Sequence, residues 1–195
     1  MAFTVVMRSD GSRTAVEGEI RKLYWDRYAA RLSSFPDTLV AELDPSGHVE
    51  CAAGIHFGIQ GLFSECYLDL PVERILSRRF GCVIRRNRVV EVSNLAATTP
   101  GQSLPFVRRV VEFAEKADAE WAIFTATRAL RALLQRGGIN MIELARAERS
   151  RVKNPNDWGN YYDHDPRVMA VSHGMAFANM RLSSASGQIG LVANA

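Results

Sequence analysis

Residues 89–126 read VVEVSNLAATTPGQSLPFVRRVVEFAEKADAEWAIFTA, and this stretch decides the fold class. Val89–Ala96 is a β-prone run, and Trp121–Ala126 is a second apolar run of strand length. Between them Ser103 can cap a helix that holds Pro105 in its first turn. A strand, a crossover helix and a strand of this length form a βαβ unit. The two strands are therefore predicted to be parallel neighbours, which gives an α/β fold with a mixed central sheet flanked by helices.

Weaker patterns on either side of this unit predict the remaining elements. Apolar residues at three- and four-residue intervals indicate helices, and apolar runs bounded by turn residues indicate strands. The expected elements are a strand at Phe3–Met7, a helix at Thr14–Leu32 ended by Pro36, a hairpin of Thr38–Leu43 with Val49–Ile59, a helix at Leu68–Phe80, a helix capped by Thr127 and stopped by Gly137-Gly138, and late strands at Met141–Leu144 and Val168–Ser172. Residues 1–182 are expected to form one domain, and residues 183–195 a loose C-terminal tail.

Length and composition restrict the class of protein. A chain of 195 residues is long enough for one well-buried core and short for two. Apolar residues make up 47% and charged residues 23%, which is the range of globular proteins and excludes a disordered or fibrous chain. The net charge of +3 is too small for a dedicated nucleic-acid-binding domain.

Cysteine usage and the lack of targeting signals indicate an intracellular protein. The three cysteines are odd in number and show no CxxC spacing, which argues against a disulfide framework and a zinc site. The N-terminus does not resemble a secretory signal, and no apolar run approaches the roughly 20 residues that cross a bilayer. We therefore expect a cytoplasmic protein without a membrane span.

Four segments together carry a resemblance to a known family. They read LFSECYLD at residues 62–69, EVSNLA at 91–96, FTAT at 124–127 and WGNYYD at 158–163. In this order and at this spacing they resemble the bacterial thermostable hemolysin family, over roughly residues 3–175. That family's pattern is similar to GNAT-like acyltransferases and, within them, to acyl-homoserine lactone synthases. The resemblance implies a single GNAT-like domain whose two central parallel strands splay apart, so that a pantetheine arm inserts between them.

The resemblance also implies the donor. It would be an acyl thioester on the phosphopantetheine of an acidic acyl carrier protein or of coenzyme A, acting as a co-substrate rather than a tightly bound cofactor. The loop Thr98–Ser103 departs from the glycine-rich pattern that binds pyrophosphate in coenzyme A-dependent relatives, and it offers few backbone N–H groups. This departure favours a carrier protein. The candidate donor-binding residues are Leu95, Ala96, Gly101, Gln102 and Ser103.

Acyl transfer needs a base and donors for the developing oxyanion. Glu91 and Glu65 are the candidate bases, because burial near a strand can raise the pKa of a carboxyl toward neutrality. Each carboxylate could instead be paired with one of the arginines. Asn94 is the candidate clamp for the substrate, beside the backbone N–H groups of the splayed strand. It could equally cap the bend at the end of that strand.

A polar and aromatic cluster supplies the remaining candidates. A hydroxyl of Tyr161 or Tyr162 could protonate the departing thiolate, and Asp163 and His164 could bind substrate. The alternative is a folded loop that covers the sheet edge. No metal site is expected, since His164 and its neighbouring aspartates lack further ligands. His56 could bind substrate or be hydrogen-bonded within its strand.

Six arginines lie between residues 74 and 88. Arg78, Arg79, Arg85 and Arg86 would suit docking of an acidic carrier protein or, less favourably, of RNA, because arginine binds phosphate and carboxylate groups in a bidentate manner. The ordinary alternative is a solvated helix face.

The leading functional hypothesis is an acyltransferase that moves an acyl group from a carrier-protein or coenzyme A thioester to a small-molecule amine. Two alternatives belong to other classes. One is a membrane-active lytic protein, as the family name suggests. The other is a non-catalytic module that binds nucleic acid or protein on the same fold.

Overall fold

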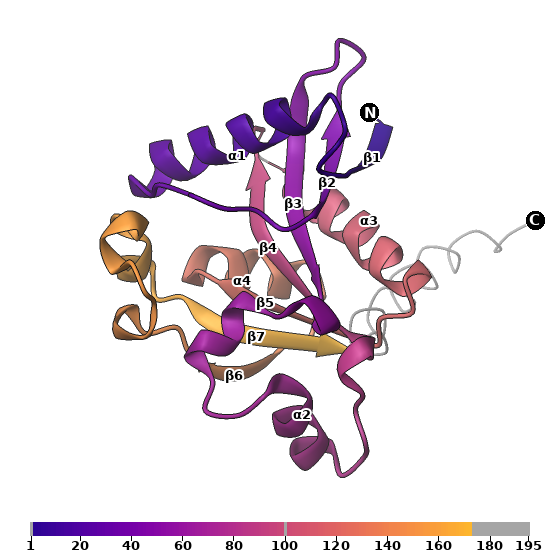
Figure 1. Ribbon diagram of the computed structural model, residues 1–195, viewed down its shortest axis with the longest axis vertical. Helices are drawn as coiled ribbons and strands as arrows, with labels where there is room; N and C mark the ends of the chain where they lie inside the picture. The colour runs from indigo at the N-terminus through magenta and orange to yellow at the C-terminus, as the bar shows by residue number, and fades with distance from the viewer. Residues whose placement is uncertain (1, 100, 173–195) are drawn as a thin grey trace, which may run out of the picture.

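The predicted βαβ unit lies at the centre of a seven-stranded sheet (Figure 1). It consists of β4 (Val89–Ala97), α3 (Ser103–Lys116) and β5 (Trp121–Ala126), and β4 and β5 are parallel neighbours as predicted. The computed structural model describes residues 2–99 and 101–172. The predicted domain end at residue 182 and the predicted tail at 183–195 lie outside the described residues.

The other elements extend the sheet on both sides of this unit. They are β1 (Ala2–Val6), α1 (Arg13–Tyr28), β2 (Thr38–Leu43), β3 (Val49–Phe57), α2 (Val72–Phe80), α4 (Arg128–Arg136), β6 (Ile142–Arg146) and β7 (Arg167–Ser172). The strand order is β1-β2-β3-β4-β5-β7-β6, and every neighbouring pair except β4–β5 is antiparallel. Within the described ranges, no helix combines the length and apolar character that crossing a bilayer requires.

Helices cover both faces of the sheet because successive strand residues point to opposite sides. On β2, Leu39 packs with Val16 and Ile20 of α1, whereas the next residue, Val40, packs with Phe106 of α3. The helix α2 joins the core on the side of the short turn at 63–67, and α4 packs with α3. The fold is therefore the predicted α/β arrangement of a mixed sheet between two helical layers.

Three predicted helix boundaries were wrong. The helix expected at Thr14–Leu32 ends at Tyr28, since Ala29 takes a left-handed conformation (φ 52°) and donates its N–H to the Trp25 carbonyl. The helix expected from Leu68 begins only at Val72, directly after Pro71.

The third wrong boundary is the start of α3. Ser103 was expected to cap this helix, but the helix begins at Ser103 itself and no side-chain cap bond forms there. By contrast, the Thr127 hydroxyl caps α4 as predicted, by accepting the Leu130 N–H at 3.4 Å.

Residues 29–37, between α1 and β2, form an irregular segment that we call the strap.

The central feature of the sheet is that β4 and β5 separate after three residue pairs. Pairing runs from Val89–Trp121 to Glu91–Ile123, and no pairing of these two strands is described beyond that point. On its other edge β4 stays paired with β3, but Asn94 and Leu95 together face Ala53. Asn94 takes φ 53°, as a β-bulge that bends a strand commonly requires. We call the opening between the strands the fork; it confirms the predicted splay.

Two glycines test how tightly the chain packs at the start of β4. A Cβ on Gly58 would meet the Arg86 carbonyl oxygen at 2.1 Å, whereas a Cβ on Gly18 in α1 would meet nothing within 4 Å. We expect Gly58→Ala to lower the free energy of unfolding by about 2 kcal/mol or more, because backbone must move. The matched Gly18→Ala should raise it by roughly 0.5–1 kcal/mol. Urea unfolding measures both; similar stabilities of the two variants would contradict the close approach at Gly58.

Candidate active site

Two cavities meet in the fork. An apolar cavity of about 170 Å³ lies mainly among α3, α4 and β5, and a polar cavity of about 560 Å³ lies between the strap, residues 63–67 and residues 151–161. The residues common to both linings are Tyr24, Val92, Asn94, Thr125 and Tyr161. A molecule in one cavity can therefore reach a molecule in the other through the opening in the sheet.

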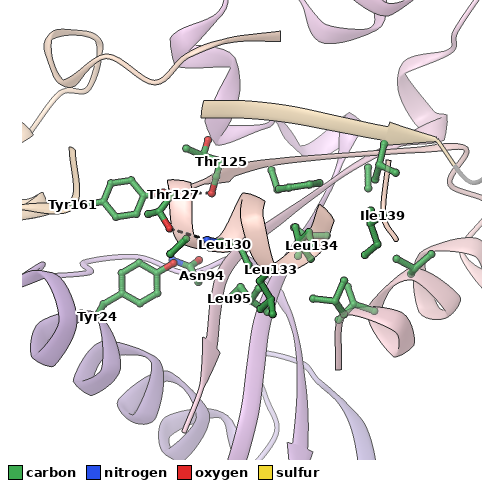
Figure 2. A pocket seen from close by; sticks show the side chains of 18 of the residues that line it. Tyr24, Asn94, Leu95, Thr125, Thr127, Leu130, Leu133, Leu134, Ile139 and Tyr161 are labelled. Carbon is green, nitrogen blue, oxygen red and sulfur yellow. Dashed lines mark hydrogen bonds between the residues drawn. The ribbon is translucent and has the colours of Figure 1, made fainter. Parts of the chain in front are cut away.

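The apolar cavity has one polar end and one aliphatic end. Figure 2 shows Tyr24, Asn94 and Tyr161 gathered at one end, next to the fork, and Leu134 and Ile139 at the other. Most of the remaining lining is aliphatic. Such a cavity suits a hydrocarbon chain with a polar group at its fork end.

A third cavity of about 400 Å³ shares Tyr24 and Leu95 with the apolar cavity and extends to Thr98 and Thr99 at the end of β4. It forms an entrance groove along β4. Among the predicted donor-binding residues, Leu95 and Ala96 line this groove. The other three, Gly101, Gln102 and Ser103, belong to none of the three linings.

Glu91 is a buried carboxyl in the wall of the polar cavity. It is the last β4 residue paired with β5, and it is 1% exposed. Its Oε1 accepts the Ser64 N–H at 3.0 Å and the Ser64 hydroxyl at 2.5 Å. Burial raises the pKa of Glu91 to about 7, although the hydrogen bonds from Ser64 act in the opposite direction.

The second oxygen of Glu91 is unoccupied. Oε2 is buried and makes no hydrogen bond of ordinary geometry with the described residues. A buried acceptor of this kind is costly to leave unpaired, so it is a natural contact for a proton-bearing ligand. Glu91 can thus hold or release a proton near neutral pH.

A chain of hydrogen bonds crosses the fork from Glu91. The Ser64 hydroxyl lies 2.8 Å from the Thr125 hydroxyl on β5, and the Tyr161 hydroxyl donates to the Thr125 carbonyl at 3.4 Å. Glu91, Ser64, Thr125 and Tyr161 come from the four segments that carried the family resemblance. Those segments, far apart in sequence, converge on one hydrogen-bonded group.

The other candidate base is arranged differently. Both oxygens of Glu65 accept hydrogen bonds from Arg86, at 2.6 and 2.7 Å, and Glu65 lines none of the three cavities. Burial alone would raise the pKa of Glu65, but the Arg86 guanidinium and the Val72 N–H lower it below its ordinary value. The structure corrects the expectation of a raised pKa and favours the alternative, in which this carboxylate is paired with an arginine.

His56 lies beside Glu91. The two residues are direct partners in the β3–β4 ladder, so their side chains share one face, and both line the polar cavity. No side-chain hydrogen bond of His56 is seen within the described ranges. Burial lowers the pKa of His56, although the charge of Asp37 acts in the opposite direction, so the imidazole is neutral at pH 7.

The polar and aromatic cluster divides. Tyr161 is buried and lines both cavities, and burial raises its pKa well above the ordinary value. Tyr162 does not line the cavities, but its hydroxyl lies 2.7 Å from that of Tyr67, which does. Asp163 and His164 are exposed and line none of the three cavities, so their predicted contact with substrate is not supported. His164 instead packs its ring edge-on against Tyr28.

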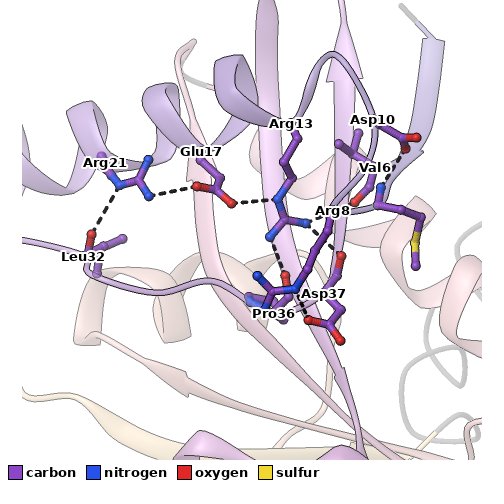
Figure 3. Close-up of polar contacts among 10 residues, drawn as sticks. Val6, Arg8, Asp10, Arg13, Glu17, Arg21, Leu32, Pro36 and Asp37 are labelled. Carbon is purple, nitrogen blue, oxygen red and sulfur yellow. Dashed lines mark hydrogen bonds and ion pairs between the residues drawn. The ribbon is translucent and has the colours of Figure 1, made fainter.

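The strap forms one wall of the polar cavity and is fastened by arginine hydrogen bonds (Figure 3). Arg13 donates to the Pro36 carbonyl at 2.5 Å and to the Asp37 carbonyl at 2.8 Å, and it is oriented by Glu17 at 2.7 Å. Arg21, also bound to Glu17, reaches the Leu32 carbonyl at 3.3 Å. The wall is thereby attached to α1 at several points.

The arginine-rich segment lies away from these cavities. None of the three linings includes a residue between 74 and 88. Arg78, Arg79 and Arg85 are exposed, whereas Arg86 is occupied by Glu65, Glu73 and the Gly58 carbonyl. Arg86 therefore braces the fold, which corrects its assignment to carrier docking.

Sequence reasoning missed several residues of this site. Ser64 and Thr125 lay inside the quoted segments but received no role, because serine and threonine occur in many structural positions and do not mark a site by themselves. Tyr24 lay inside the predicted helix Thr14–Leu32 and received no role. No three His, Cys, Asp or Glu side chains of the described residues come together as a metal site would require.

Comparisons with known proteins fit this geometry. A family model described as thermostable hemolysin matches residues 6–177, and no curated protein matches in sequence. Among solved structures, the chain is similar to the AHL synthase LasI, with a TM-score of 0.61 and 11% identity over 100% of this chain and 98% of that one.

Two further solved structures are similar over most of their length. One is FeeM, an N-acyl amino acid synthase from uncultured soil microbes (TM-score 0.60, 14% identity, 91% of this chain and 95% of that one). The other is MesI, a CoA-dependent acyl-homoserine lactone synthase (TM-score 0.57, 16% identity, 98% of each chain). Likeness at this level of identity establishes the shared fold.

The raised pKa of Glu91 predicts how the stability of the fold depends on pH. Because the pKa of Glu91 is about 7 in the fold and 4.5 ordinarily, the fold favours the protonated form. The free energy of unfolding is therefore highest below pH 4.5, and it falls by about 3 kcal/mol as the pH rises to 7. We expect Glu91→Gln to match wild type at pH 4.5 and to be more stable above pH 7, measured by urea unfolding.

Glu65→Gln is the matched control, with the opposite sign. The lowered pKa of Glu65 adds stability above pH 4.5 that is lost as the pH falls. Glu65→Gln should therefore be destabilised most at neutral pH. Parallel pH profiles for wild type and Glu91→Gln would contradict the raised pKa of Glu91.

Proposed function

The chain belongs to the thermostable hemolysin family, and from its forked sheet with a cavity on each side we propose that it is an acyltransferase that moves an acyl group from a pantetheine thioester to an amine. The observation that carries the proposal is the meeting of the two cavities beside Glu91. Ligands of open α/β sheets tend to bind where strands part at their carboxyl ends. The names of LasI, FeeM and MesI describe enzymes that make acylated products, which supports the same class of reaction.

The residues of the fork suit this reaction. The thioester would lie in the fork, with its pantetheine arm in the entrance groove and its acyl chain in the apolar cavity. The amine nitrogen attacks the thioester carbon from the polar cavity, the carbonyl oxygen becomes an oxyanion, and the carbon–sulfur bond then breaks. The proton lost by the amine passes to Glu91, directly or through water, and the thiolate leaves as a thiol with a proton from solvent.

The apolar cavity favours an acyl chain longer than acetyl. An apolar cavity of about 150 Å³ is large enough for benzene, a molecule of six carbons. The cavity here is about 170 Å³. We expect a chain of about six carbons or more, carried by a carrier protein or by coenzyme A. Docking of an acidic carrier on Arg78, Arg79 and Arg85 stays a prediction.

The proposal is tested by thiol release. The protein is incubated with acetyl, hexanoyl and decanoyl thioesters of acyl carrier protein and of coenzyme A, with and without a panel of amines, and free thiol is measured. Turnover should rise with pH through about 7, as Glu91 loses its proton. Glu91→Gln should lower turnover on the order of 100-fold while donor binding is kept. An amine-independent signal would contradict transfer to an amine, and wild-type turnover in the Glu91→Gln variant would exclude Glu91 as the base.

Chain-length preference tests the apolar cavity. Ala122 lines this cavity on β5, so Ala122→Phe should fill it. We expect the variant to lose roughly 10-fold or more in kcat/KM for decanoyl thioesters and little for acetyl thioesters, because only the long chain needs the space. Val83→Phe is the control, at a position that is 87% exposed and lines none of the three cavities. An equal loss for both donors would count against this assignment.

A further inference from the structure

Two cations of the polar cavity have no carboxylate partner among the described residues. Arg31 comes from the strap and Lys153 from the connection between β6 and β7, and both line the cavity. The third cation of the lining, Arg151, is fully used: it donates to the Cys66 and Leu68 carbonyls and to Asp69, at 2.8 to 2.9 Å. Arg31 and Lys153 are therefore the charges that remain for a ligand.

Arg31 is held in place without being neutralised. Its backbone N–H donates to the Asp157 carbonyl at 2.6 Å, and its guanidinium lies over the Trp25 ring, 5.4 Å from the ring centre. The strap that carries it is attached to α1 through Arg13 (Figure 3). A cation that is already ordered pays less entropy when an anion binds.

The charges of the wall match an anion with a single charge. Apart from Arg151, which is paired with Asp69, the lining carries two positive charges, Arg31 and Lys153, and two carboxyls, Asp157 and Glu91; while Glu91 holds its proton, a surplus of one positive charge is left. A carboxylate would be balanced by this surplus. A doubly charged phosphate would leave excess negative charge in a cavity that also contains Glu91.

We propose that Arg31 and Lys153 form a carboxylate subsite, so that the acceptor is an amino acid whose amine points to the fork. This inference rests on the proposed acyl transfer and names the class of its acceptor. The product would be an N-acyl amino acid, with the chain in the apolar cavity and the carboxylate at the wall of the polar cavity. Arg31 forms the bidentate contact that a guanidinium offers to a carboxylate, and Lys153 adds a point charge.

Binding of product-like probes tests the subsite without requiring turnover. The probes are N-hexanoylglycine, N-hexanoylphenylalanine, their primary amides, and N-hexanoyl-O-phosphoethanolamine, each titrated into the protein by calorimetry. We expect at least one carboxylate to bind about 10-fold or more tightly than its amide and than the phosphate probe. Arg31→Gln and Lys153→Gln should each remove most of that preference while leaving amide binding unchanged.

The matched controls are Arg108→Gln and Lys116→Gln, which exchange the same residue types on α3, at positions that line none of the three cavities. They should keep the preference for the carboxylate. Equal binding of acid and amide, tighter binding of the phosphate probe, or no measurable binding of any carboxylate probe overturns the subsite. If carboxylates are preferred but no thiol is ever released, the subsite stands and the proposed acyl transfer falls. If thiol is released equally well with amines that lack a carboxylate, the proposed acyl transfer stands and the carboxylate subsite falls.

Discussion

Three residue pairs hold β4 against β5, and the rest of the site depends on where that pairing stops. Parallel strands normally continue side by side, because each backbone N–H and C=O needs a partner. Here the bulge at Asn94 bends β4 while its other edge stays paired with β3, so the sheet opens without losing its integrity. The opening gives the apolar and polar cavities a common boundary, which neither helical layer could supply alone.

The base of the opening contains a group that is itself expensive to bury. An ionised carboxyl at 1% exposure costs several kcal/mol in most proteins, and Glu91 meets this cost by holding its proton up to about pH 7 and by binding Ser64. Ser64 in turn contacts Thr125 on the opposite strand. The polar chain thus joins the two arms of the fork at its base. Buried groups that lower the stability of the fold and have a strongly shifted pKa are commonly part of a functional site.

The sequence was informative where structure is local and less so where contacts are distant. The βαβ unit, the Thr127 cap and the splay followed from periodicity, from turn chemistry and from family resemblance. The end of α1 was missed because Leu32 continues the apolar spacing of the helix although it belongs to the strap, and Arg13 fastens that strap through backbone carbonyls that no pattern marks. Glu91 and Glu65 looked alike in sequence. They differ because Arg86, twenty-one residues from Glu65, folds back onto it, whereas Glu91 meets only hydroxyl and amide groups.

Entry from two sides has a consequence for the order of events in a two-substrate reaction. The groove at the end of β4 leads to the apolar cavity, and the polar cavity is bounded by the strap and residues 151–161, so the two substrates need not pass one another. In the proposed acyl transfer both substrates can therefore be present at once, and the acyl group can move directly between them without first being stored on the protein. The half-buried Cys66 agrees with this, since burial raises the pKa of its thiol to about 11 and leaves it a poor nucleophile. An architecture of this kind favours sequential kinetics through a ternary complex over a ping-pong mechanism.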